Sequence, residues 1–273
     1  MEKTTNIALG DQSVLGSLGD FVVKIADCPE EIAAAQSLRH QVFFKDTQNP
    51  ACSGEAARDE DFFDQFCDHL IVVESSGKPA NVIATYRLMG QEQMMRAGRF
   101  YSQTEFDVNA LIDRHKGLRF LELGRSCVKP EYRTKRTIEL LWHGSWAYVR
   151  KHQYDVMFGC ASFAGKQVEQ HRDGLSFLFA SAKPDPNWDV KALGDAIDLE
   201  GLCLDQNGVN LKAGLRSLPP LVKGYLRLGA MFATQAVIDH DFDTIDVLVL
   251  LPVSRLNPRY VNYYGENAER HGV

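Results

Sequence analysis

Alternating apolar and polar stretches along the chain predict a mixed α/β protein. Residues 30–46 place apolar side chains at helical spacing, and residues 137–153 form the most regular amphipathic helix, with Thr137 as its expected N-cap. Short runs rich in valine, leucine, isoleucine and phenylalanine predict strands at residues 66–74, 81–89, 119–128 and 155–163. This alternation indicates a central twisted mixed sheet flanked by helices.

The same pattern suggests where the folded domain begins and ends. Residues 1–20 are rich in Gly, Ser and Asp, which predicts a flexible N-terminal tail, and residues 21–265 are expected to form a single domain with a C-terminal extension. The turn residues of "SSGKPA" predict a hairpin between the first two strands. Further short helices are predicted at residues 100–115, 175–182 and 219–229, followed by one or two strands.

Composition narrows the class of protein. The 273-residue chain has a net charge of −6, which disfavours a general nucleic-acid-binding role. Its start lacks the apolar core of a secretion signal, and no apolar run reaches the roughly 18 to 20 residues of a membrane span. We therefore expect a cytoplasmic protein that contacts the inner face of the cell membrane at most peripherally. The six cysteines show no CxxC pair or zinc spacing, and Cys127 and Cys160 lie in apolar runs typical of core positions.

Charged residues interrupt the predicted strand 119–128. Glu122 in this strand needs a partner if it is buried and ionised, and an ion pair with Arg125 or Arg87 is the structural interpretation. On a regular strand Glu122 and Arg125 would face opposite sides, but a bulge at Gly124 would change that geometry. A bulged strand beside a diverging neighbour exposes backbone groups that an extended, amide-bearing ligand can pair with.

A basic stretch follows this strand directly. Arg133, Lys135 and Arg136 lie between the strand and the start of the predicted helix 137–153. A helix N-terminus with cations beside it is a good phosphate site, although such residues are also common on solvated surfaces. A metal site near His240 is not predicted, because alternating residues of "VIDHDFDTID" diverge. A hydrogen-bonded turn is expected there, and a role of this segment in the acceptor pocket is the alternative.

Several of these positions match a known superfamily. The "VKPEYR" of residues 128–133 resembles the V-x-P-x-Y-R of GCN5-related N-acyltransferases, between strand and helix. The glycine-free "RTKRT" that follows resembles the branch that takes acyl groups from acyl carrier protein, which includes the acyl-homoserine-lactone synthases. Arg39, Val42 and Phe43 match its R-x-x-V-F, and two further matches are Asp61 with Asp64 and Glu122 with Arg125.

The resemblance to the L-ornithine N-α-acyltransferases is closer. It extends from about residue 35 to 260 and includes "FDQFCDHLIVVE", "LELGRSCV", "LPPLVKGYLRLGA" and "VIDHDFDTIDVLVLLP". It implies transfer of a 3-hydroxyacyl chain from acyl carrier protein to the α-amine of ornithine, which gives lyso-ornithine lipid. The donor substrate would be the acyl-phosphopantetheine of the carrier protein, and no bound cofactor or metal is implied.

This resemblance also implies roles for individual residues. Glu122 is the candidate base, acting directly or through a water, with Arg125 beside it. The candidate acceptor-binding residues are Arg39, Arg87 and Arg125 for the carboxylate and Asp61, Asp64 and Asp68 for the side-chain ammonium. The candidate residues for the acyl chain, the pantetheine arm and the carrier protein are Phe43, Phe158, Val128, Arg133, Lys135 and Arg136.

Other functions remain open at this point. The same chemistry could act on another amino acid or amine, or produce an acyl-homoserine lactone. A protein that only binds acyl carrier protein is the alternative that is not an enzyme.

Overall fold

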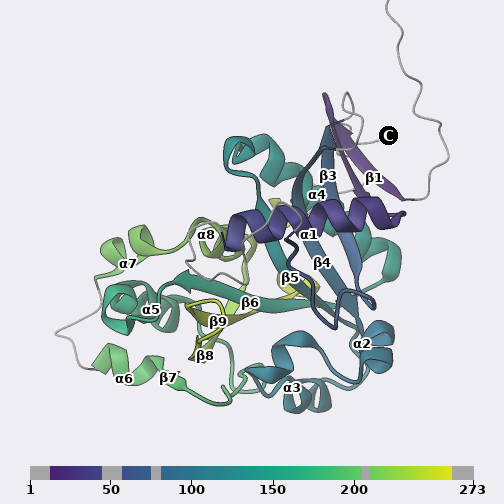
Figure 1. Cartoon of the computed structure of the whole chain (residues 1–273). Coiled ribbons are helices and arrows are strands. Elements are labelled where there is room, and N and C mark those ends of the chain that lie inside the picture. The colour runs from purple at the N-terminus through teal and green to yellow at the C-terminus, as the bar shows by residue number, and fades with distance from the viewer. Residues whose placement is uncertain (1–12, 45–56, 75–80, 205–209, 260–273) are drawn as a thin grey trace, which may run out of the picture.

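A single nine-stranded sheet organises the chain (Figure 1), with the strand order β1-β2-β3-β4-β5-β6-β9-β8-β7. The computed structural model describes residues 13–44, 57–74, 81–204 and 210–259. Neighbouring strands are antiparallel except for β5 and β6, which run parallel, so the predicted mixed sheet is confirmed. The strands are β1 Val14–Leu18, β2 Phe21–Ile25, β3 Asp68–Glu74, β4 Asn81–Gly90, β5 Phe120–Val128, β6 Val156–Ala164, β7 Ala196–Asp198, β8 Met231–Asp239 and β9 Thr244–Pro252.

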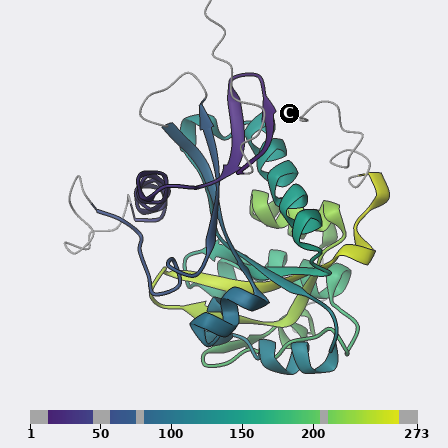
Figure 2. The ribbon, with the colours of Figure 1, turned by 90° about the vertical axis from the view of Figure 1, so that its right-hand side faces the viewer.

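Helices cover both faces of the sheet. They are α1 Pro29–Phe43, α2 Gln91–Ala97, α3 Val108–Arg114, α4 Lys135–His152, α5 Val168–Ala182, α6 Leu199–Leu204, α7 Leu211–Ser217 and α8 Pro220–Leu228, with the short 3-10 helices η2 Tyr101–Thr104, η3 Pro130–Tyr132 and η4 Val253–Arg255. Figure 2 shows α1 on one side of the strands and α4 on the other. We call these two sides the α1 face and the α4 face.

Strand alternation divides the core between the two faces. Leu121 and Leu123 of β5 pack into the same cluster as Leu140 and Leu141, on the α4 face. Phe120, directly before Leu121, points to the opposite, α1 face and belongs to a separate cluster. Because neighbouring strand residues point to opposite sides, Glu122 shares the α1 face with Phe120.

Strands β5 and β6 diverge after a short parallel contact. Their pairing covers only Phe120–Glu122 against Val156–Phe158. Beyond it, β5 stays paired with β4 and β6 stays paired with β9. At the point of divergence the two backbones approach closely, since a Cβ added to Gly159 would lie 2.2 Å from the carbonyl oxygen of Leu123. The gap in the hydrogen-bond ladder therefore begins immediately after Glu122.

A bulge in β5 decides which way its charged residues face. Arg87 of β4 pairs with Gly124 and Thr85 pairs with Cys127, so two residues of β5 oppose Tyr86. The irregular residue is Arg125, at φ 50, one position after the predicted Gly124. The extra residue brings Arg125 to the α1 face, the same face as Glu122, as the ion pairs of Arg125 described below confirm.

Several local predictions need correction. Residues 14–18 form the edge strand β1, so the predicted tail over residues 1–20 is wrong there; residues 1–12 lie outside the described part. Helix α4 begins at Lys135, and its N-cap is Thr134 and not the predicted Thr137. The Thr134 hydroxyl accepts the backbone N–H of Thr137, which is the third residue of the helix.

Several other helices also differ from the predictions. The predicted helix 100–115 is two short elements, η2 and α3, while α2, α6 and α7 were not predicted. The predicted hairpin of β3 and β4 is confirmed, although its turn at residues 75–80 lies outside the described part. Among the described helices, none is both long enough and apolar enough to cross a membrane.

We predict that Gly159→Ala destabilises the fold, because the new methyl group would overlap the Leu123 carbonyl oxygen. Overpacking of this kind costs about 1–3 kcal/mol, measurable as a lower urea midpoint. Gly124→Ala is the matched control, since a Cβ there meets no atom within 4 Å. Equal midpoints for the two variants would contradict this account of the divergence point.

Candidate functional site

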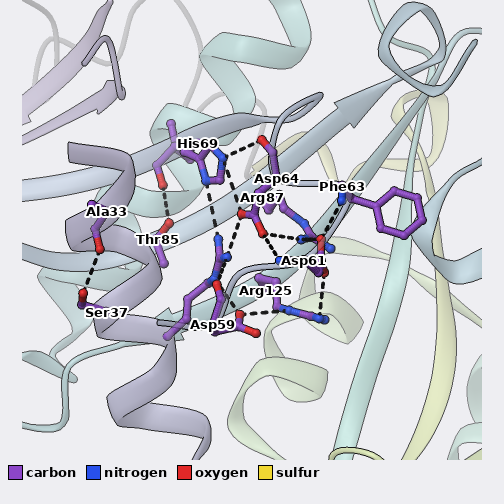
Figure 3. A network of polar contacts seen from close by, with 12 residues as sticks. Ala33, Ser37, Asp59, Asp61, Phe63, Asp64, His69, Thr85, Arg87 and Arg125 are labelled. Atoms are coloured by element: carbon purple, nitrogen blue, oxygen red, sulfur yellow. Dashed lines mark hydrogen bonds and ion pairs between the residues drawn. The ribbon is translucent and has the colours of Figure 1, made fainter. Parts of the chain in front are cut away.

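Three arginines and three aspartates form a closed ring of ion pairs on the α1 face (Figure 3). The pairs are Arg39–Asp59 at 2.8 Å, Asp59–Arg125 at 3.1 Å, Arg125–Asp61 at 3.1 Å, Asp61–Arg87 at 2.7 Å, Arg87–Asp64 at 3.3 Å and Asp64–Arg39 at 2.7 Å. Each arginine contacts two aspartates and each aspartate contacts two arginines. We call this arrangement the arginine–aspartate ring.

The ring joins elements that are distant in sequence. Arg39 comes from α1, Arg87 from β4 and Arg125 from the bulge of β5, while the aspartates come from residues 59–64. Three positive and three negative charges give it no net charge. Since a buried charge is costly without a partner, this compensation allows the ring to lie in a largely buried place.

Exposure differs around the ring and indicates different roles. The side chains of Arg39 and Arg87 are 0% and 3% exposed, whereas Arg125 is 11% and Asp61 25% exposed. Arg39, predicted to bind the acceptor, is fully buried, and its guanidinium also donates to the Asp59 carbonyl oxygen. Arg39 therefore holds the 59–64 segment, and the accessible edge of the ring is formed by Arg125 and Asp61.

The ring keeps Asp61 ionised. Burial alone would raise the pKa of Asp61, but the positive charges of Arg87 and Arg125 outweigh it, so the pKa lies below its ordinary value. His69 lies behind the ring with its Nε2 3.1 Å from the Asp64 carbonyl oxygen, as expected of a structural histidine at the start of a strand. Burial lowers the pKa of His69, so the imidazole stays neutral and does not disturb the charge balance.

Asp68 does not join the other two predicted aspartates. Its carboxylate accepts the hydroxyl of Tyr148 at 2.6 Å and the side-chain amide of Gln93 at 3.1 Å. In the register of β3, Asp68 lies next to His69 and therefore points to the opposite side. Asp68, predicted to bind the acceptor, therefore belongs to a hydrogen-bond network separate from the ring.

Glu122 is held by the start of η2 and not by an arginine. Its carboxylate accepts the backbone N–H groups of Tyr101 at 2.8 Å and Ser102 at 2.7 Å, and the Ser102 hydroxyl at 2.5 Å. The predicted ion pair with Arg125 or Arg87 is therefore wrong. Burial raises the pKa of Glu122, and the bonds from Ser102 and Tyr101 oppose this only in part.

Aromatic rings enclose Arg125. Its guanidinium carbon lies 4.6 Å from the ring centroid of Tyr101 in η2 and 4.6 Å from that of Phe242 in the turn between β8 and β9. Tyr101 also contacts Arg87, at 5.3 Å, so one aromatic ring covers two members of the arginine–aspartate ring. Contacts of this kind stabilise a cation whose hydration shell has been removed.

A second acidic group lies on the same face and was not predicted. A carboxylate oxygen of Glu105, a carboxylate oxygen of Asp246 and the Sγ atom of Cys160 all lie within 4.8 Å of one another. The Cys160 thiol donates to Glu105 at 3.3 Å, and Asp246 accepts the Thr244 hydroxyl at 2.8 Å. Burial, followed by the negative charge of Asp246, raises the pKa of Glu105 to about 7. The signal in the sequence was the acidic residue in "SQTEFDV", but only the fold brings it to β6 and β9.

The predicted acyl-chain residues occupy different environments. Phe158 is 2% exposed and packs edge-on against Phe100, with ring centroids 5.0 Å apart. Phe158, predicted to line the acyl slot, thus packs in the buried cluster that contains Phe100. Phe43 lies at the end of α1, 6.2 Å from the ring of Phe242, and so borders the aromatic enclosure of Arg125.

The basic residues gather at the start of α4. Arg133 donates to the carbonyl oxygen of Val128 at 3.2 Å, and Arg136 donates to that of Leu18 at 2.6 Å. Lys135 is 86% exposed and pairs with Glu139 at 3.3 Å. Lys135 and Arg136 belong to the first turn of the helix itself, since Thr134 is the cap.

Two further predictions are confirmed. Asp239 accepts the N–H groups of Asp241 and Phe242, which gives the expected hydrogen-bonded turn between β8 and β9. Cys127 is 5% exposed, and burial raises the pKa of its thiol to about 12, as expected for a core position.

Comparisons with known proteins agree with the fold. Residues 38–143 match a family described as "Acetyltransferase (GNAT) domain". The L-ornithine N(alpha)-acyltransferase of Brucella abortus is 48% identical over 269 residues, covering 96% of this chain and 94% of its own. The protein of the same name from Agrobacterium fabrum is 46% identical over 268 residues, covering 96% and 91%.

A solved structure shows the same architecture at low sequence identity. FeeM, an N-acyl amino acid synthase from uncultured soil microbes, aligns with a TM-score of 0.52 at 9% identity. The alignment covers 86% of this chain and 93% of FeeM. At this identity the likeness concerns the fold alone.

We predict that Arg39→Met strongly destabilises the protein, because Asp59 and Asp64 each lose a buried partner. Breaking a buried ion pair costs about 3–5 kcal/mol, which chemical denaturation would measure. Lys135→Met removes the same charge from an exposed side chain and should change stability by less than about 0.5 kcal/mol. Similar losses for both variants would contradict a structural role for the ring.

Proposed function

The chain belongs to the L-ornithine N(alpha)-acyltransferase family, and from this premise we propose that it transfers a 3-hydroxyacyl group from acyl carrier protein to the α-amine of L-ornithine. The product is lyso-ornithine lipid. The observation that carries the proposal is the divergence of β5 and β6 directly beside Glu122 and Arg125. A thioester placed in that gap would meet an acceptor bound on the α1 face.

The gap suits an extended donor arm. Beyond Glu122 and Phe158 the two strands no longer pair with each other. Phosphopantetheine contains two amides in an extended chain, and such amides can pair with a free strand edge as an added strand does. The donor thus fits between β5 and β6, with its thioester near the start of the divergence.

The start of α4 supports an anionic donor. Arg133, Lys135 and Arg136 lie at the positive end of the helix dipole, and the first turn contains no acidic residue. Cations are unfavourable at a helix N-terminus unless an anion is bound there. A pantetheine phosphate would supply this anion, and the acidic surface of a carrier protein would add long-range attraction.

The acceptor is proposed to bind against the accessible edge of the arginine–aspartate ring. The Arg125 guanidinium is the most exposed of the three and can receive the acceptor carboxylate. Asp61, at 25% exposed, is the corresponding acid for an ammonium group. Arg87 and Asp64 hold these two side chains in place.

Helix α7 supports a peripheral membrane contact of the enzyme. Leu211 and Leu215 are 52% and 46% exposed on this helix. Lys212 and Arg216 follow them, and no acidic residue occurs from residue 211 to 228. An apolar pair flanked by cations suits a peripheral contact with anionic lipid.

The test is product identification by mass spectrometry. Purified protein would be incubated with 3-hydroxyacyl-carrier protein and a panel of amino acids that includes ornithine. We expect N-acyl-ornithine to dominate, ornithine blocked at the α-amine to give no product, and ornithine blocked at the side-chain amine to remain a substrate. A different dominant acceptor would overturn the ornithine assignment, and tight carrier-protein binding without any product would indicate a binding module.

The donor surface generates a separate prediction. Lys135→Glu should lower kcat/KM for the carrier-protein thioester about tenfold at low salt, with a smaller loss at high salt. The same variant should react almost normally with a short acyl-pantetheine thioester that lacks the carrier protein. Lys212→Glu makes the same charge change on α7 and is the control. Equal losses in both variants would argue against a carrier-protein surface at α4.

A further inference from the structure

The proposed reaction requires a group that removes a proton from the acceptor. The α-amine of a free amino acid is an ammonium near pH 7, and an ammonium cannot attack a thioester. The base must lie on the α1 face, where the acceptor is proposed to bind, and close to the divergence of β5 and β6. Carboxylates outside the arginine–aspartate ring that meet this condition include Glu122, Glu105 and Asp246. Asp246 is 6% exposed and accepts the Thr244 hydroxyl, which leaves Glu122 and Glu105 for comparison.

Glu122 is poorly suited to receive a proton. Three donors from Tyr101 and Ser102 occupy its carboxylate, and only 5% of the residue is exposed. Protonating the oxygen that Ser102 engages would place a proton against a donating N–H and a donating hydroxyl. The carboxylate of Glu122 therefore anchors the start of η2.

Glu105 occupies the other end of the same short helix. Its backbone N–H donates to the Ser102 carbonyl oxygen at 3.1 Å, so η2 carries Glu122 at its start and Glu105 at its end. The Glu105 side chain reaches Cys160, two residues beyond the last paired residue of β6, Phe158. Glu105 thus lies beside the unpaired part of β6, where the proposed thioester would be.

Three carboxylates around Glu105 disfavour its negative charge. They are Asp246 of β9, Asp239 of β8 and Glu122 of β5, whereas the hydrogen bond from the Cys160 thiol of β6 favours the ionised form and opposes them. Within the described part of the chain, Glu105 forms no ion pair with a cation, and the positive charge of Arg125 acts on Asp246. Burial raises the pKa of the Cys160 thiol, which remains a hydrogen-bond donor to Glu105.

We propose that Glu105 is the proton acceptor for the attacking amine, with Asp246 and Cys160 as positioning residues. This inference rests on the proposed function and assigns its base. The α-ammonium gives one proton to the Glu105 carboxylate, and the freed nitrogen lone pair forms a C–N bond with the thioester carbonyl carbon. As the C–S bond breaks, the nitrogen loses its second proton and the pantetheine thiolate gains one, which leaves amide and thiol; Glu105 then releases its proton to solvent.

This role explains why the acidic neighbours are useful. Burial raises the pKa of Glu105 most, and the negative charge of Asp246 raises it further. Without these effects the carboxylate would remain ionised far below pH 7 and would be a weak base for an ammonium. With its pKa raised to about 7, Glu105 is ionised above neutral pH and takes up a proton readily. Activity should therefore fall as the pH drops below about 7, because the base becomes protonated.

The test is the pH dependence of kcat/KM for N-acyl-ornithine formation in wild type and matched variants. Glu105→Gln should lower activity about 10²–10⁴-fold and remove the decline near pH 7, since only the ionisation of the amine itself remains. Asp246→Asn should move the decline to lower pH, because one like charge beside Glu105 is lost. Glu200→Gln changes an exposed residue of α6; it is the control and should retain the wild-type profile.

The outcomes separate the two levels of the proposal. A Glu105→Gln variant with wild-type thermal stability that keeps the decline near pH 7, or an Asp246→Asn profile identical to that of wild type, would overturn the role of Glu105 while the acyl transfer stands. If wild type makes no N-acyl-ornithine, the proposed function fails independently, and the same profiles would be measured with whichever amino acid is acylated. If Glu105→Gln does not fold, the shift in Asp246→Asn still decides the question.

Discussion

The arginine–aspartate ring is the interaction on which the geometry of this face depends. It connects α1, β4, the bulge of β5 and the 59–64 segment through six ion pairs. Arg125 has a left-handed backbone conformation, at φ 50, which costs an ordinary residue about 1–2 kcal/mol. Its pairs with Asp59 and Asp61 offset that cost, so the bulge and the ring support each other.

The two charged groups of the α1 face have opposite electrostatic character. The ring is balanced, with every aspartate matched by an arginine. The group around Glu105 and Asp246 has two carboxylates close together and a neutral thiol. A cationic, zwitterionic acceptor such as ornithine fits between them, because it can offer a carboxylate to Arg125 and an ammonium to the acidic side. The transfer of one proton to Glu105 would then start the reaction.

Much of this arrangement was accessible from sequence because it follows from local patterns. The hydrophobic periodicity located β3 to β6 and the cores of α1, α4 and α8, and motif matching brought Arg39, Asp61, Asp64, Glu122 and Arg125 together. The features that the sequence patterns did not predict depend on contacts between distant segments. Asp59 differs from neighbouring acidic residues only through its bonds to Arg39 and Arg125. Glu105 acquires its environment from β6 and β9, and β1 is an edge strand of five residues whose composition resembles a loop.

The surroundings of other predicted site residues also depend on the fold. Arg39 and Phe158 were assigned to ligands because of their type, and the structure places both side chains in the interior, one in the arginine–aspartate ring and the other against Phe100. Asp68 was grouped with Asp61 and Asp64 by proximity in sequence, while strand alternation directs it toward Tyr148. Motif spacing identifies the segments that form the site. The alternation of side chains along a strand, together with burial, decides which groups each side chain contacts.

We place the donor between β5 and β6 and the acceptor beside this gap on the α1 face. A crystal structure with bound N-(3-hydroxyacyl)-ornithine would test this arrangement most directly. The account predicts the amide of this product at the divergence of β5 and β6, with the ornithine carboxylate on Arg125 and the amide nitrogen near Glu105. A product bound away from this gap, with its carboxylate far from Arg125, would contradict it.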